Sequence, residues 1–412
     1  MSSVQEAAPT VRAEQRRTLK VAIAGLGVAS TQILPAMERM PEIQLVAAAD
    51  PRREARAAFQ ARYQGRVYET VEQLCADPEV EAVWICTPNQ YHCEHVITAA
   101  EHGKHIVVEK PMALTIEECE RMVAAAERHR VKLLCGHTQS FNPAIQAMRR
   151  IIKSGELGRL CAINTWMYTD WMLRPRMPQE LDLSLGGGVV YRQGPHQIDT
   201  VRLLGGGLLR SVRAMVGQWM PERPAPGYYA AYLEFADGTP ATVVYNGYGY
   251  FDTSELTWGI GERYYTPEER VTIRQALRSG TRDEEQAKEA MRFGGQREGE
   301  FAHGAPGERR RLPGGGSFFG VTVVSCERGD IRQSPHGLYI YSDAGQREIP
   351  VEGRYASRSS ELQELYDAVT QDRPVFHDGR WGMATLEVCL AIMQSARERR
   401  EILLTHQSPI PD

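Results

Sequence analysis

The sequence lacks paired cysteines, long apolar runs and any strong excess of charge. Its eight cysteines are scattered singly and form no C-x-x-C pair, which argues against a disulfide framework and a zinc site. No apolar run is long enough to span a bilayer, and the polar first 18 residues lack the hydrophobic segment of a signal peptide. A net charge of −4 gives no reason to expect nucleic acid or a membrane as partner. We therefore expect a cytoplasmic protein without a bound metal.

The chain of 412 residues is long enough for two domains, and its hydrophobic content of 42% is ample for two cores. Apolar runs first alternate with helical patterns, which predicts an α/β domain with a doubly wound parallel sheet, a Rossmann fold. Later segments of β character predict an α+β domain with a largely antiparallel, open sheet. An open sheet face usually needs a partner, so we expect a homodimer or homotetramer. The predicted parts are a disordered tail (1–18), a cofactor domain (19–140), and a substrate and oligomerisation domain (141–412) with a charged insertion (259–316).

A glycine turn follows the first apolar run, and an aspartate closes the second. Gly25 permits a tight turn, and Gly27 lets the backbone approach a phosphate at a helix N-terminus. Asp50 is placed to accept hydrogen bonds from the adenosine ribose and to repel a 2′-phosphate, which favours NAD. Arg52 follows closely and keeps NADP open as an alternative. The candidate cofactor-binding residues of this unit are Gly25, Gly27, Val28, Ala29, Asp50 and Arg52.

Two later apolar runs end in short polar segments whose side chains can take part in binding or catalysis. One run ends in Thr87-Pro88-Asn89 and the other in Glu109-Lys110-Pro111. The carboxyl ends of parallel strands meet at one edge of a sheet, where such folds bind their ligands. We therefore expect both segments to border the nicotinamide.

The Glu-Lys-Pro segment is followed by a glycine-rich stretch, Gly186-Gly187-Gly188 continuing to Gly194-x-His196-x-x-Asp199. This combination resembles the glucose–fructose oxidoreductase and inositol dehydrogenase family over nearly the whole chain. The resemblance implies that Lys110 reaches the reacting hydroxyl and that His196 occupies the acid–base position. It also implies that a further set of residues borders the cofactor: Thr87, Pro88, Asn89, His92 and Glu109. An enclosed lysine or a neutral histidine can accept a hydroxyl proton, and the sequence leaves open which is the base.

The chain departs from that pattern at one position. Many relatives place an aspartate four residues before the histidine, and here Arg192 stands there. A guanidinium cannot orient an imidazole as a carboxylate does, but it binds carboxylates in a bidentate geometry. The upstream segment adds Trp171, Arg174 and Arg176. We expect these side chains to hold a substrate that carries carboxylates, with solvated loop charges as the alternative for Arg174 and Arg176.

Those arginines and the charged insertion resemble the branch of the family that contains phthalate 4,5-cis-dihydrodiol dehydrogenase. The resemblance implies that NAD oxidises a carboxylated cis-dihydrodiol to a dihydroxylated aromatic acid, a reaction driven by aromatisation. Two alternatives remain open. One is an NAD(P)-dependent dehydrogenase of sugars, inositols or sugar acids, and the other is a non-catalytic NAD-binding sensor on the same fold.

Overall fold

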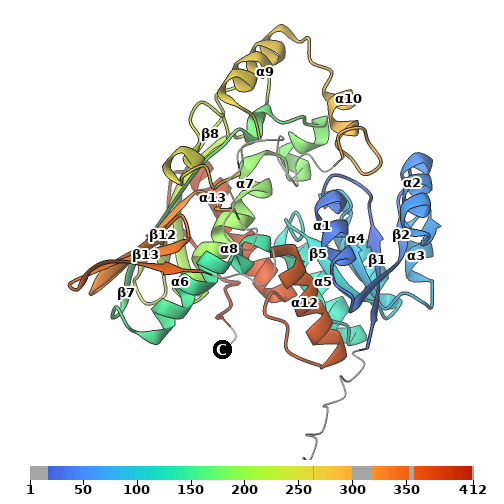
Figure 1. Cartoon of the computed structure of the whole chain (residues 1–412), viewed down its shortest axis with the longest axis horizontal. Helices are drawn as coiled ribbons and strands as arrows, with labels where there is room; N and C mark the ends of the chain where they lie inside the picture. Colours follow the sequence, from blue (N-terminus) through green and yellow to red (C-terminus); the bar gives the residue numbers. More distant parts are fainter. Residues whose placement is uncertain (1–16, 263, 299–316, 352–356, 411–412) are drawn as a thin grey trace, which may run out of the picture.

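The computed structural model describes residues 17–262, 264–298, 317–351 and 357–410 (Figure 1). These residues form a parallel and a mixed sheet, each with its own helices. Within the described residues, no helix combines the length and the apolar character that crossing a bilayer requires. The expected tail lies almost wholly outside the described residues, as does the end of the charged insertion from residue 299.

The first sheet, sheet A, has six parallel strands in the order β3-β2-β1-β4-β5-β6. This arrangement confirms the predicted doubly wound parallel sheet. The chain leaves β1 for β2 on one side and later for β4 on the other, so the strand order reverses between β1 and β4, the position at which open α/β sheets bind their ligands. The strands are β1 (Leu19–Ala24), β2 (Ile43–Ala49), β3 (Arg66–Tyr68), β4 (Ala82–Ile85), β5 (His105–Glu109) and β6 (Leu133–Gly136).

Helices cover both faces of sheet A, which explains why its strands read as unbroken apolar runs. Alternate residues of β1 enter different cores: Val21 and Ile23 pack on one face, and Ala22 and Ala24 on the other. The helices of this half are α1 (Ser30–Glu38), α2 (Arg53–Tyr63), α3 (Val71–Cys75), α4 (His92–Glu101) and α5 (Ile116–His129). They are joined by α12 (Ser357–Thr370), which comes from the far end of the chain and packs against α1.

The second sheet, sheet B, has nine strands in the order β14-β13-β12-β11-β7-β10-β9-β8-β15. Only β7 and β10 pair in parallel, so the predicted largely antiparallel sheet is confirmed. The strands are β7 (Leu160–Tyr168), β8 (Leu209–Gly217), β9 (Tyr228–Phe235), β10 (Pro240–Asn246), β11 (Val321–Cys326), β12 (Gly329–Gln333), β13 (Gly337–Ser342), β14 (Gly345–Pro350) and β15 (Ile402–Leu403).

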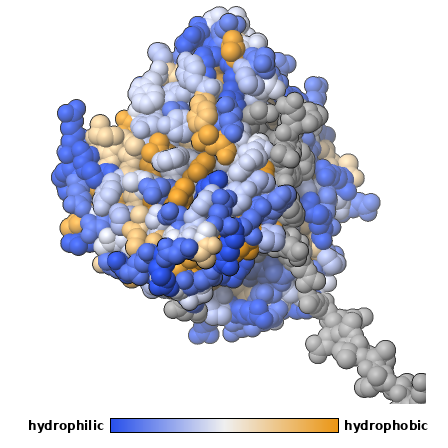
Figure 2. Space-filling model, turned by 60° about the vertical axis from the view of Figure 1, so that its left-hand side comes forward, coloured by the Kyte–Doolittle hydropathy of each residue, from blue (hydrophilic) through white to orange (hydrophobic). Residues whose placement is uncertain are grey.

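One face of sheet B is covered by helices and the other is open. The helices of this half are α6 (Pro143–Ser154), α7 (Gly188–Arg192), α8 (Gly194–Gly205), α9 (Pro267–Ser279), α10 (Glu284–Glu289) and α13 (Gly379–Glu398). Two successive helices span the glycine-rich stretch, since α7 ends at Arg192 and α8 starts at Gly194. On the open face, Trp166, Met215 and Tyr232 are 45%, 52% and 50% exposed. Figure 2 shows a band of hydrophobic residues across the side on which sheet B lies.

Candidate active site

The glycine turn after β1 has the geometry that a pyrophosphate requires. Gly25 has φ +96°, and a Cβ on it would lie 2.8 Å from the carbonyl oxygen of Cys86. A Cβ on Gly27 would meet no atom within 4 Å, so the turn is open on that side. Val28 and Ala29 lead into α1. The backbone of this turn therefore fits a dinucleotide phosphate.

Asp50 fastens the turn to the end of β2. Its Oδ2 accepts a hydrogen bond from the Leu26 N–H at 2.8 Å, and its side chain is buried. The Arg52 side chain folds back over the same carboxylate, with Nε 3.1 Å from Asp50 Oδ1 and Nη2 2.6 Å from the Leu26 carbonyl oxygen. Asp50 thus lies at the carboxyl end of β2 against the glycine turn, and Arg52 lies beside it.

The loops after β4 and β5 are joined by His92. Its two ring nitrogens lie 2.9 Å from the Thr87 carbonyl oxygen and 3.0 Å from the Pro111 carbonyl oxygen. The ring is buried, and a neutral imidazole donates to only one of the two carbonyls at a time. His92 therefore holds the loops after β4 and β5 together from the protein interior. The loop after β5 contains a cis Lys110–Pro111 bond.

Asn89, which follows Thr87-Pro88, faces the glycine-rich stretch of the second half. Its Nδ2 has no hydrogen-bond partner among the described residues and is buried. A Cβ on Gly186 would lie 3.1 Å from that atom, at a φ of +70°. The amide of Asn89 therefore lies where the two halves of the molecule meet.

Lys110 is enclosed at the end of β5. Its Nζ donates a hydrogen bond to the carbonyl oxygen of Arg192 at 3.0 Å. Burial lowers the pKa of Lys110 to about 8, Glu109 opposes this lowering, and the charges of Arg358 and Arg192 add to it. The neighbouring Glu109 is itself held by Arg358 of α12, with Nη1 2.7 Å from Oε1, and by Trp84 Nε1 at 3.3 Å.

His196 lies in the first turn of α8, one helical turn beyond Arg192. Its Nδ1 is buried and has no hydrogen-bond partner among the described residues, and its ring packs on Phe319 at 5.5 Å between centroids. Burial holds the pKa of His196 well below its ordinary value, and the charge of Lys110 acts in the same direction. The imidazole is therefore neutral and lies within electrostatic range of Lys110.

Beside Lys110, three cationic side chains surround one buried carboxylate. We call this group the Glu180 cluster: Glu180, Arg176, Arg192 and Lys288. Glu180 Oε1 lies 2.9 Å from Lys288 Nζ, 3.4 Å from Arg176 Nη1 and 3.8 Å from Arg192 Nη1. The Arg176 guanidinium also stacks on the Trp171 ring at 3.6 Å. Because one carboxylate faces three cations, the cluster keeps a net positive charge.

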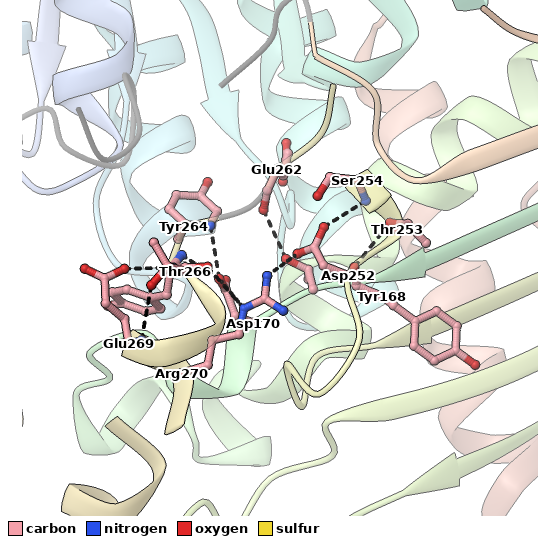
Figure 3. A network of polar contacts seen from close by, with 12 residues as sticks. Tyr168, Asp170, Asp252, Thr253, Ser254, Glu262, Tyr264, Thr266, Glu269 and Arg270 are labelled. Carbon is pink, nitrogen blue, oxygen red and sulfur yellow. Dashed lines mark hydrogen bonds and ion pairs between the residues drawn. The ribbon is translucent and has the colours of Figure 1, made fainter. Parts of the chain in front are cut away.

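Arg174 does not contact the Glu180 cluster's carboxylate but binds Asp170 and Thr169 instead. It is buried, donates to Asp170 and Thr169 at 3.2 Å each, and lies 3.4 Å over the Tyr264 ring. Asp170 also accepts from the backbone N–H groups of Tyr264 and Tyr265, at 3.0 and 2.9 Å. Figure 3 shows how Asp170, through its contact with Tyr264, joins the loop after β7 to the segment that leads into α9. Arg174 therefore fixes the loop that carries Trp171 and Arg176.

Sequence reasoning missed Glu180, Lys288 and Arg358. Each belongs to a segment without a recognisable motif, and the contacts that bring them to the site, Lys288 with Glu180 and Arg358 with Glu109, join residues far apart in the sequence. Within the described residues, no group of three or more His, Cys, Asp or Glu side chains is arranged to hold a metal ion.

Two family models match the chain. The model of the oxidoreductase family with an NAD-binding Rossmann fold matches residues 19–137, and the model of the GFO/IDH/MocA C-terminal domain matches residues 145–259. A 1-carboxy-3-chloro-3,4-dihydroxycyclohexa-1,5-diene dehydrogenase of Comamonas testosteroni is 34% identical over 386 residues, which are 92% of this chain and 95% of the relative.

Solved structures agree with the fold. A protein of Bordetella bronchiseptica RB50 has 37% identity and a TM-score of 0.85, with 94% of this chain and 100% of that chain covered. A levoglucosan dehydrogenase in complex with NADH and levoglucosan has a TM-score of 0.71 at 20% identity, with 94% and 99% covered, and shows the fold alone. The chain is an enzyme of the GFO/IDH/MocA family, an oxidoreductase that uses NAD.

Proposed function

We propose that the enzyme oxidises a carboxylated cis-dihydrodiol to the corresponding dihydroxylated aromatic acid. The observation that carries the proposal is the hydrogen bond between Lys110 Nζ and the Arg192 carbonyl oxygen, at 3.0 Å. This bond places the amine of Lys110, whose pKa is lowered, against the backbone of Arg192. The guanidinium of Arg192 belongs to the positively charged Glu180 cluster. The Comamonas testosteroni relative is named for a ring that bears a carboxylate and two hydroxyls.

Lys110 is the proposed base. In its neutral form it donates one N–H to the Arg192 carbonyl and keeps its lone pair for a substrate hydroxyl. His196 is a weaker candidate because burial holds its pKa well below its ordinary value, which makes its neutral imidazole a poor proton acceptor. We assign His196 the role of a neutral hydrogen-bonding group that orients the diol through its unpaired Nδ1.

The Glu180 cluster is the proposed binding site for the substrate carboxylate. Arg192 is the member nearest to Lys110, and its buried Nε has no hydrogen-bond partner among the described residues. A carboxylate placed there would gain charge-assisted hydrogen bonds from that guanidinium. Arg176 and Trp171 would form the aromatic and cationic side of the site, and Arg174 would support it from behind.

The chemistry balances without a further reactant. Lys110 would accept the proton of the substrate hydroxyl, and NAD held by the cofactor half would supply the hydride acceptor for the carbon that bears this hydroxyl. The resulting hydroxyketone would enolise to a catechol, its ring C–H proton being replaced by a proton on the ketone oxygen, and the gain of aromaticity would drive the reaction. Residues 19–140 would hold the cofactor and residues 141–412 the substrate, with Thr87, Pro88, Asn89 and Glu109 along the cofactor side.

The decisive experiment is a substrate panel read by NADH absorbance. The purified enzyme with NAD should oxidise cis-dihydrodiols that bear a ring carboxylate, with little activity on myo-inositol or an aldose. Turnover of a polyol or an aldose together with no turnover of any carboxylated cis-dihydrodiol would contradict the proposal.

A further inference from the structure

A segment of the charged insertion reaches from the Glu180 cluster to the cofactor half of the molecule. We call residues 284–298 the strap; it comprises α10 and the turns after it. At one end Lys288 pairs with Glu180 at 2.9 Å. At the other end the buried Phe293 packs on Phe59 and Tyr63 of α2, at 6.2 and 6.1 Å between ring centroids. In Figure 1, α10 lies above the space between the two halves.

The strap brings a carboxylate to Arg52. Glu289, the last residue of α10, accepts a hydrogen bond from Arg52 Nη1 at 2.6 Å. Its neighbour Lys288 and the nearby Phe293 are both buried, so the backbone around Glu289 is held from two sides. The fold therefore fixes the position of Glu289 next to Arg52.

The Arg52 guanidinium is fully engaged as a result. Nε and Nη2 face Asp50, Nη2 also donates to the Leu26 carbonyl oxygen, and Nη1 faces Glu289. Two carboxylates thus share the Arg52 guanidinium, and Glu289 also accepts a hydrogen bond from Arg292 Nη1 at 2.6 Å. All three nitrogens of the Arg52 guanidinium are therefore committed to contacts within the protein. The 2′-phosphate of NADP carries a charge of about −2 at neutral pH.

We propose that Glu289 is a cofactor-selecting residue that disfavours NADP. It holds Nη1 of Arg52, which would otherwise be free to pair with a 2′-phosphate, and it also holds Arg292. The neighbouring Arg56 is engaged by the backbone carbonyl oxygens of Asp50 and Pro51. The inference rests on the use of NAD and not on the substrate proposed above. Cofactor binding measured without substrate therefore tests it separately.

The test compares Glu289→Gln with Glu298→Gln, using the fluorescence of bound NADH and NADPH. Glu298 is the matched control because it also joins the strap to α2, through Arg62 at 3.0 Å, but does not contact Arg52. Since Glu289 is half-exposed, we expect Glu289→Gln to raise the affinity for NADPH relative to NADH by roughly two- to fivefold. Glu289→Lys should shift this ratio further, and added salt should shrink both shifts.

Two results would overturn the inference. One is an unchanged ratio of NADPH to NADH affinity in Glu289→Gln. The other is an equal change in Glu298→Gln, which would assign the effect to docking of the strap rather than to the charge at residue 289. Melting temperatures of both variants near that of the native protein would show that the fold is intact.

Discussion

At the scale of the residue, the site depends on how burial acts on two proton-bearing groups. Enclosure lowers the pKa of Lys110 to about 8, whereas the pKa of His196 is held well below its ordinary value. One group therefore titrates within the range in which enzymes work, and the other stays neutral throughout it. This difference favours Lys110 as the proposed base, a choice that the sequence alone left open between the two residues.

The pH dependence of oxidation should follow Lys110. The neutral amine is the active form, so kcat/KM should fall about tenfold for each pH unit below about 8 and reach a plateau above it. Steady-state rates between pH 6 and 9.5 measure this profile. Lys110→Arg keeps the positive charge but has no basic form in this range, so it should lose turnover while NADH binding, followed by fluorescence, is retained. A flat profile in the native enzyme would refute the assignment of Lys110 as the base.

At the scale of the element, strand ends and the turns after them build the cofactor side. The turn between β1 and α1 is held by Asp50 at the end of β2, and the loops after β4 and β5 are held together by His92. Each contact joins neighbouring strands at one edge of sheet A. The parallel sheet therefore positions these residues before any ligand binds.

Replacing each of the two glycines of the first turn by alanine should have a different effect on stability and on NAD binding. Gly25→Ala places a Cβ 2.8 Å from the Cys86 carbonyl at a positive φ, so it should lower the melting temperature as well as NAD binding. Gly27→Ala places a Cβ in open space and should fold normally but bind NAD much more weakly, because the methyl group occupies the approach of the phosphate. Calorimetry and NADH titration separate the two effects. Normal NAD affinity in Gly27→Ala would show that the phosphate does not lie at this turn.

At the scale of the whole molecule, the open face of sheet B is the feature that most needs a partner. Trp166, Met215 and Tyr232 come from three strands of this sheet and are each about half exposed. Exposed apolar area of this kind on a regular sheet marks an association surface. A second copy of the chain would cover it by a symmetric contact.

We expect multi-angle light scattering to give a mass of two or four chains. Tyr232→Glu should shift the protein toward the monomer, because it places a charge in the middle of the buried contact. The exposed Arg128→Glu, on α5 of the other half, is the matched change of surface charge and should leave the mass unaltered. A monomer for the native protein at micromolar concentration would contradict the expectation.

Much of sheet A was predictable because its signals are local. The glycine turn, Asp50 and the Glu109–Lys110 segment follow apolar runs of strand length, and the parallel sheet brings such ends together. Lys288 and Arg358 were not predictable, because a single charge in a polar helix carries no sign of its distant partner. The polar strand β14 was not predictable either, because it has no buried residue and therefore no alternating pattern of apolar residues.

The loop of Trp171, Arg174 and Arg176 contains two arginines whose different environments could not be predicted from the sequence. Its composition indicated a carboxylate site, and the structure places Arg176 in the Glu180 cluster beside Arg192. Arg174, with the same side chain two residues earlier, is instead bound to Asp170. Arg174 pairs with a carboxylate four residues before it and Arg176 with one four residues after it. Contacts of the insertion, Tyr264 under Arg174 and Lys288 on Glu180, complete the two different environments.

The most direct test of the account is the preference for a ring carboxylate, measured as kcat/KM for one cis-dihydrodiol with and without that group. A charge-assisted contact with Arg192 predicts that the native enzyme favours the carboxylated diol by about 10- to 100-fold. Arg192→Gln should remove most of that preference, whereas the exposed Arg278→Gln of α9 should keep it. Equal kcat/KM values for the two diols in the native enzyme would contradict the central claim that the Glu180 cluster holds an anionic substrate beside Lys110.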